Sequence, residues 1–132
     1  MGREARRVPA NWQHPRDEIT GAYKPLRPYS HYRSNVQEFL NMVNTEGLKA
    51  AVDDIGELLN IHDYMPDFPP EQCTHLMMYE DTTEGTPISP AFKTPEELAM
   101  WLVNNNARVL CDYQTSYVMW LGIIYDSLSV AQ

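Results

Sequence analysis

The sequence predicts an α+β fold, in which about four helices pack on a small irregular antiparallel sheet. Three observations support this fold class. Apolar residues recur at helical spacing in several segments, a short apolar run typical of a strand lies between them, and prolines interrupt the chain where these segments end. The 132 residues suffice for one domain. A domain of this length buries roughly two thirds of the surface of its unfolded chain.

Charge divides the sequence into two regions. Residues 1–33 carry seven of the ten Lys and Arg residues and three acids, whereas residues 34–132 carry three basic and fifteen acidic side chains. We therefore expect a basic, proline- and aromatic-rich N-terminal arm (residues 1–33) ahead of an acidic α+β domain (residues 34–132). The net charge of −8 predicts that the acidic body repels nucleic acid and anionic membranes and attracts a basic partner. In the alternative interpretation, the negative charge only keeps the protein soluble.

The proline content of the N-terminal arm disfavours a long helix and favours extended or turn structure. Trp12, Tyr23, Tyr29 and Tyr32 are interleaved with its four prolines. Two interpretations are open. In the first, the arm wraps around the acidic body and these aromatic side chains hold it there. In the second, it contacts a phosphate backbone or an acidic partner. Proximity within one chain favours the first.

Two helices are predicted after the arm. Apolar residues at positions 36, 39, 40 and 43 follow one helical face, and Ser34 is the predicted N-cap. A second helix is predicted over residues 48–59, although Gly56 weakens it by roughly 1 kcal/mol relative to alanine. We expect the two helices to form an antiparallel pair.

A short hairpin is predicted in the middle of the chain. Residues 63–70 form a proline-rich linker, and residues 74–79 are a strand candidate. The polar residues 80–85 predict a turn, and residues 86–92 predict an extended segment. Because that segment contains prolines, it is an edge strand at best. The two segments are expected to pair irregularly.

The clearest local signal is the start of the next helix. Thr94 is the predicted N-cap, Pro95 occupies the first helical position, and Glu97 completes a capping box. Three consecutive asparagines at 104–106 predict its end.

The C-terminal region is predicted to contain a short strand at residues 107–111 and a last helix that begins near Thr115 or Ser116. The apolar stripe expected for this helix is Tyr117, Trp120, Leu121, Ile124 and Leu128.

The sequence contains no motif that carries a reaction. The four histidines lack metal-ligand spacing; His62, Asp63 and His75 come closest but lack a recognisable further ligand. We therefore expect no metal site, no cofactor and no enzymatic activity. Cys73 and Cys111 are expected to be reduced thiols in an intracellular protein. No secretory signal is visible, and no apolar run approaches the ~20 residues that span a bilayer.

Two groups of carboxylates are the candidate partner-binding residues. We expect the first group on the polar face of the second helix and the second group in the turn of the hairpin, and a solvated face is the simplest interpretation of both. If the groups have a function, they contact a basic protein surface. The residues are Asp53, Asp54, Glu57, Glu80, Asp81 and Glu84.

Two blocks of the sequence carry a resemblance. The first is Arg-Arg-Val-Pro-Ala-Asn-Trp-Gln-His-Pro at residues 6–15, and the second covers residues 63–90 and 94–102. Its most specific part is Glu-Gly-Thr-Pro-Ile-Ser-Pro at residues 84–90. Both blocks resemble a family of small uncharacterised proteins encoded by tailed bacteriophages and prophages, whereas residues 34–62 do not match. The family has no assigned activity or catalytic residue to carry over.

The resemblance implies a phage accessory protein that acts in the host bacterial cytoplasm, a class that often binds and blocks a host enzyme. Three functions stay open. The first is a non-enzymatic inhibitor of a host nucleic-acid-handling machine, such as a CRISPR complex or a nuclease, which binds through its acidic surface. The second is a phage structural module that forms a homo-oligomer through residues 88–92. The third is a small enzyme whose site is assembled from loops.

Overall fold

The computed structural model describes residues 2–110 and 113–129, and the chain forms two compact units. The first unit comprises Met1–Pro25 and Phe68–Ala131, and the second comprises Leu26–Asp67. The division that charge predicted, after residue 33, lies inside helix α1 (Tyr29–Glu46). The boundaries between the compact units, after Pro25 and after Asp67, therefore differ from the charge boundary after residue 33.

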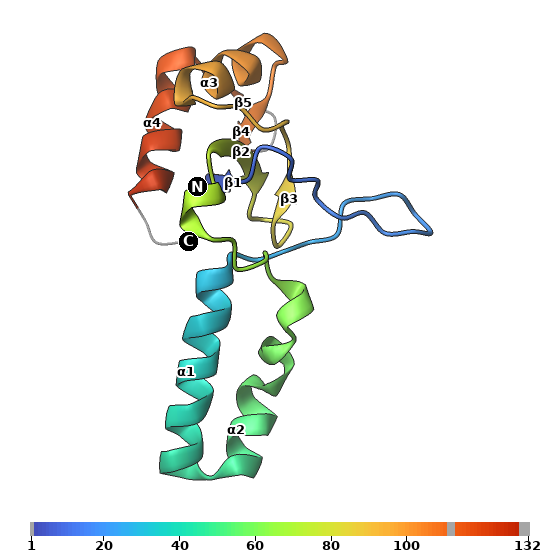
Figure 1. Cartoon of the computed structure of the whole chain (residues 1–132), viewed down its shortest axis with the longest axis vertical. Coiled ribbons are helices and arrows are strands. Elements are labelled where there is room, and N and C mark those ends of the chain that lie inside the picture. Colours follow the sequence, from blue (N-terminus) through green and yellow to red (C-terminus); the bar gives the residue numbers. More distant parts are fainter. Residues whose placement is uncertain (1, 111–112, 130–132) are drawn as a thin grey trace. The chain divides into compact units, whose positions relative to one another are not determined.

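The first unit is built on a small antiparallel sheet with the strand order β1-β2-β3 (Figure 1). Strand β1 (Arg3–Val8) pairs along its length with β2 (His75–Glu80), and β2 pairs with the short β3 (Thr86–Pro87). A second, two-stranded sheet joins β4 (Arg108–Leu110) to β5 (Tyr113–Gln114). The α+β class and the small irregular antiparallel sheet are confirmed; Cys111, the last residue of the predicted strand 107–111, lies outside the described residues.

Strand β1 makes the start of the N-terminal arm, for which the sequence predicted extended or turn structure, part of the sheet. Four of its six residues are charged, and this hides the alternation that marks a strand in the sequence. The strand forms because β2 supplies a full backbone ladder for it. Arg3 also faces Glu80 across the two strands, with 3.4 Å between the guanidinium and the carboxylate.

Two helices of the first unit begin where the sequence predicted. In α3 (Pro95–Asn104), the backbone N–H of Glu97 donates to the Thr94 hydroxyl over 3.1 Å. In α4 (Tyr117–Leu128), the N–H of Met119 donates to the Ser116 hydroxyl over 3.2 Å. Each hydroxyl satisfies a backbone donor that the helix itself leaves free.

The central strand β2 is buried on both faces. Leu76 and Met78 join the core that α3 and α4 contribute to, whereas Met77 and Tyr79 alternate to the opposite face. This explains why four consecutive side chains of the strand are buried. The core cluster contains Ala5, Leu76, Met78, Leu98, Ala99, Leu102, Val109, Trp120, Ile123 and Ile124.

The second unit is a helix pair (Figure 1). Helix α1 is followed, after Gly47 alone, by α2 (Leu48–Ile55) and a 3₁₀ turn, η1 (Gly56–Leu59). The positive φ of Gly47, 94°, is suited to glycine and permits this tight connection. Further 3₁₀ turns lie at Ile61–Asp63 (η2) and, in the first unit, at Pro70–Gln72 (η3).

Two predicted helix limits in this unit are wrong. Helix α1 begins at Tyr29, directly after Pro28, and not at Ser34. Pro28 has an extended ψ of 143° and lacks an N–H, so it marks the start without a side-chain cap. Helix α2 ends at Ile55 because Gly56, a poor helix former, opens the 3₁₀ turn. No helix among the described residues is both long and apolar enough to cross a bilayer.

Candidate functional site

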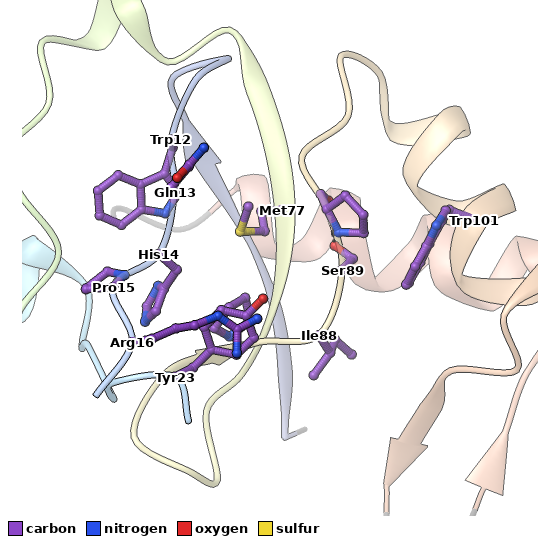
Figure 2. Close-up of a pocket in the computed structure, with 12 residues that line it drawn as sticks. Trp12, Gln13, His14, Pro15, Arg16, Tyr23, Met77, Ile88, Ser89 and Trp101 are labelled. Carbon is purple, nitrogen blue, oxygen red and sulfur yellow. Dashed lines mark hydrogen bonds between the residues drawn. The ribbon is translucent and has the colours of Figure 1, made fainter. Parts of the chain in front are cut away.

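An open pocket of about 770 Å³ lies in the first unit, on the side of the sheet that faces the N-terminal segment (residues 9–25). Figure 2 shows Trp12, His14 and Tyr23 on one side of it and Ile88, Ser89 and Trp101 on the other. Prolines 15, 87 and 90 add further ring surfaces. The permanently charged side chain among these lining residues is Arg16. The pocket therefore combines aromatic and prolyl surfaces with one positive charge.

A hydrogen-bonded network attaches the N-terminal segment to the sheet beside this pocket. The indole N–H of Trp12 donates to the Tyr79 hydroxyl over 3.0 Å, and Nδ1 of His14 lies 2.9 Å from the same oxygen. Nε2 of His14 contacts the backbone carbonyl of Lys24. Because a carbonyl only accepts, Nε2 must carry the proton, and Nδ1 accepts the Tyr79 proton. Tyr79 thus donates to His14 and accepts from Trp12.

Burial keeps this network neutral. Tyr79 is fully buried, and burial raises its pKa to about 12. Burial also lowers the pKa of His14, and the positive charge of Arg6 lowers it further. The Arg6 guanidinium lies 4.2 Å from the centre of the Tyr79 ring and 2.8 Å from the Glu4 carboxylate. Its charge is balanced by that carboxylate and by the ring face.

Three polar side chains at or next to the pocket, those of His14, Tyr79 and Ser89, form hydrogen bonds within the protein. Both nitrogens of His14 and the hydroxyl of Tyr79 belong to the network. The Ser89 hydroxyl accepts from the Met78 N–H and donates to the Pro90 carbonyl, each over 2.9 Å. A nucleophile or a general base needs a group that can exchange a proton with a substrate. The His14 and Ser89 side chains use these atoms in hydrogen bonds within the protein.

The N-terminal segment presents Arg16 from a small hairpin, in which Arg16 pairs with Tyr23. At its turn, one carboxylate oxygen of Asp17 accepts the N–H groups of Ile19 and Thr20 over 2.8 Å, and these bonds lower the Asp17 pKa. The Arg16 guanidinium lies 3.8 Å above the Tyr23 ring, and its Nη1 donates to the Gly21 carbonyl. The hairpin therefore holds an exposed cation in a defined place.

Lowering the pH is expected to destabilise the first unit through His14. An unfolded histidine gains its proton near pH 6.5, whereas the folded His14 resists protonation because burial and Arg6 lower its pKa. A proton on Nδ1 would also leave the Tyr79 hydroxyl without an acceptor. The contribution of His14 to the free energy of unfolding is thus fully present above pH 6.5. It falls by up to about 1.4 kcal/mol per pH unit as the pH drops from 6.5 towards the pKa of folded His14.

This pH dependence is measured by urea unfolding between pH 8 and pH 5. The free energy of unfolding of His14→Gln is expected to depend less on pH, because the variant lacks the contribution of His14. The control His62→Gln, at an exposed histidine, is expected to keep the pH dependence of the wild type. An equal pH dependence of the free energy of unfolding in the wild type and in His14→Gln would contradict the assignment of this effect to His14.

The structure places the first three candidate carboxylates on the second unit. Asp53 and Asp54 lie on α2 and Glu57 on η1, and all three are exposed. Lys49 contacts Asp53 over 2.7 Å, but both side chains are largely exposed, so this ion pair adds little stability. The predicted position on a polar helix face is confirmed for Asp53 and Asp54.

The other three candidates belong to the first unit, and the prediction that all three lie in the turn is wrong for Glu80, which is the last residue of β2 and pairs with Arg3 and Thr86 in the sheet. Glu80 is half-buried beside Arg3, and Asp81 and Glu84 are exposed in the turn that follows. The extended segment after this turn already pairs with β2, because Ile88 donates to Met78 and Phe92 exchanges two hydrogen bonds with Leu76.

Sequence reasoning missed the pocket and its network. It expected Trp12 to hold the N-terminal arm in place, which the structure shows, but it treated His14 as one of four scattered histidines and assigned Arg16 no role. Tyr29 and Tyr32 lie in α1 of the second unit. A usable signal was the run of four apolar residues in the strand at 76–79, since a strand with no polar face needs cover on both sides.

Among the described residues, no three His, Cys, Asp or Glu side chains are grouped to share a metal ion. Cys73 is a free thiol, and Cys111 lies outside the described part of the chain. No family model, curated protein or solved structure matches the sequence.

Proposed function

We propose that the protein is a non-enzymatic binding protein whose helix pair contacts a basic surface on a partner protein. The observation that carries this proposal is the exposure of Asp53, Asp54 and Glu57 within five residues of α2 and η1. Complementary charge accelerates association and excludes wrong partners. The second unit carries three basic and seven acidic side chains, a net charge of −4, so its field favours a cationic partner.

Apolar contact accompanies the charge on this unit. Leu48 and Val52 are 62% and 49% exposed on α2, one helical turn apart. Protein interfaces combine an apolar centre with a polar rim. An apolar strip beside carboxylates therefore fits a protein surface better than a free cation.

We propose further that the partner is a host nucleic-acid-handling enzyme or complex. Such proteins carry basic grooves for the phosphate backbone, and an acidic surface can occupy a groove of this kind. The resemblance to phage and prophage proteins supports a host target, and the homo-oligomeric phage module remains the alternative.

The test begins with affinity capture from a bacterial lysate at low and high salt and continues with the purified partner. Reversing Asp53, Asp54 and Glu57 to lysine is expected to weaken binding at least tenfold, because each lost charge contact contributes about 1 kcal/mol or more. Nucleic acid is expected to compete with the wild-type protein for the partner.

The matched control reverses three other exposed acids, Glu18, Asp67 and Glu71, and so changes the net charge equally. It is expected to retain most of the affinity. Equal loss in both variants would show only a general charge effect. Capture of this chain or of virion proteins alone would support the phage module instead.

A further inference from the structure

We propose that the pocket of the first unit binds an extended, proline-containing peptide segment of a partner protein and that Arg16 pairs with a carboxylate of that peptide. The pocket residues belong to the first unit and the acidic helix pair to the second, and the inference does not depend on the function proposed for that pair.

The surfaces of the pocket fit a polyproline-type peptide. Trp12, Tyr23 and Trp101 supply aromatic surface, and the prolines at 15, 87 and 90 also line the pocket and supply flat apolar surface. Proline-rich segments dock in aromatic-lined grooves because their extended conformation is already formed before binding. The open shape suits a chain that passes across the surface.

Arg16 supplies the charged contact. Its guanidinium is stacked on Tyr23 and donates one N–H to Gly21, so it is oriented before any ligand arrives. A guanidinium has five N–H donors in a planar fork, and the remaining donors match the two oxygens of a carboxylate. Among the described residues that line the pocket none is acidic, so we expect the complementary charge to come from the ligand.

The charges favour a peptide over a nucleic acid. Arg16 is one guanidinium, whereas nucleic-acid sites neutralise several phosphates with clustered Lys and Arg. The first unit has seven basic and eleven acidic side chains in the sequence, a net charge of −4, which repels a polyanion. A peptide with one carboxylate among prolines matches this single cation.

The experiment measures the binding of fluorescent peptides to the full chain by anisotropy. The probes are an array of short peptides that combine prolines with one glutamate, a matched array with glutamine in place of glutamate, and single-stranded oligothymidylate. At least one glutamate peptide is expected to bind, and its glutamine counterpart is expected to bind about tenfold more weakly, because a charged hydrogen-bonded pair contributes about 1.5–3 kcal/mol.

Two variants test the role of Arg16 in binding the peptide carboxylate. Arg16→Gln is expected to lower the affinity for the glutamate peptide about tenfold and to leave that for the glutamine peptide unchanged. Lys24→Gln removes the same charge from the same segment at a side chain outside the pocket lining, and it is expected to bind like the wild type. No binding across the glutamate array, tighter binding of the oligonucleotide, or equal effects of the two variants would overturn the proposal.

Discussion

Replacing Trp120 by alanine is expected to lower the free energy of unfolding of the first unit by about 3–5 kcal/mol, the range for a large aromatic side chain removed from a core. Trp120 is fully buried within the core cluster and is the largest such side chain. The loss is a large part of the roughly 5–15 kcal/mol that stabilises a typical domain. Urea unfolding followed by circular dichroism measures it.

Two variants separate packing from other effects. Within the described residues, the Trp120 indole N–H has no hydrogen-bond acceptor, so Trp120→Phe removes an unsatisfied donor and keeps an aromatic ring in the core. We expect a clearly smaller loss for phenylalanine than for alanine. Met119→Ala, at the neighbouring exposed side chain, is expected to change stability little. A loss below about 1 kcal/mol for Trp120→Ala would contradict the place of Trp120 in the core.

The elements that the sequence predicted well are those specified by neighbouring residues. Thr94 and Ser116 cap helices whose first turns lie within three residues of them, so the signal and its consequence share one segment. The α+β class followed in the same way from the apolar spacing of separate segments. The predictions were wrong at two helix ends that a proline or a glycine sets. Helix α1 begins directly after Pro28, and helix α2 ends directly before Gly56.

The strand β1 and the pocket depend on contacts between distant residues. Arg6 pairs with Met77 in the sheet ladder, and Trp12 bonds to Tyr79, which is 67 residues away. A charged hexapeptide becomes a strand only beside β2, and no local pattern shows this. The exposure of most candidate carboxylates was predictable from their type, but their distribution over two compact units was not.

The side chain that links these distant segments is Tyr79, and removing its hydroxyl is expected to cost more than the loss of one hydrogen bond. In Tyr79→Phe, the Trp12 N–H loses its acceptor and His14 Nδ1 loses its donor. Each buried polar atom left without a partner costs about 1–3 kcal/mol, so we expect a loss of about 2–4 kcal/mol in the free energy of unfolding.

A double-mutant cycle with Trp12→Phe assigns this loss to the network. If the two side chains act through one hydrogen bond, the double variant is less destabilised than the sum of the single variants, by about 0.5–3 kcal/mol. Strict additivity would contradict the shared bond. Replacing Tyr32 by phenylalanine, outside the network, is the matched control.

The same residue has a signature at high pH. Because burial raises the pKa of folded Tyr79 from 10 to about 12, the unfolded phenol releases its proton first as the pH rises above 10. Wild-type stability therefore falls between pH 10 and pH 12, and Tyr79→Phe lacks this part of the decrease. If both proteins lose stability equally in that window, the Tyr79 hydroxyl is not held in the buried, neutral state that attaches the N-terminal segment to the sheet.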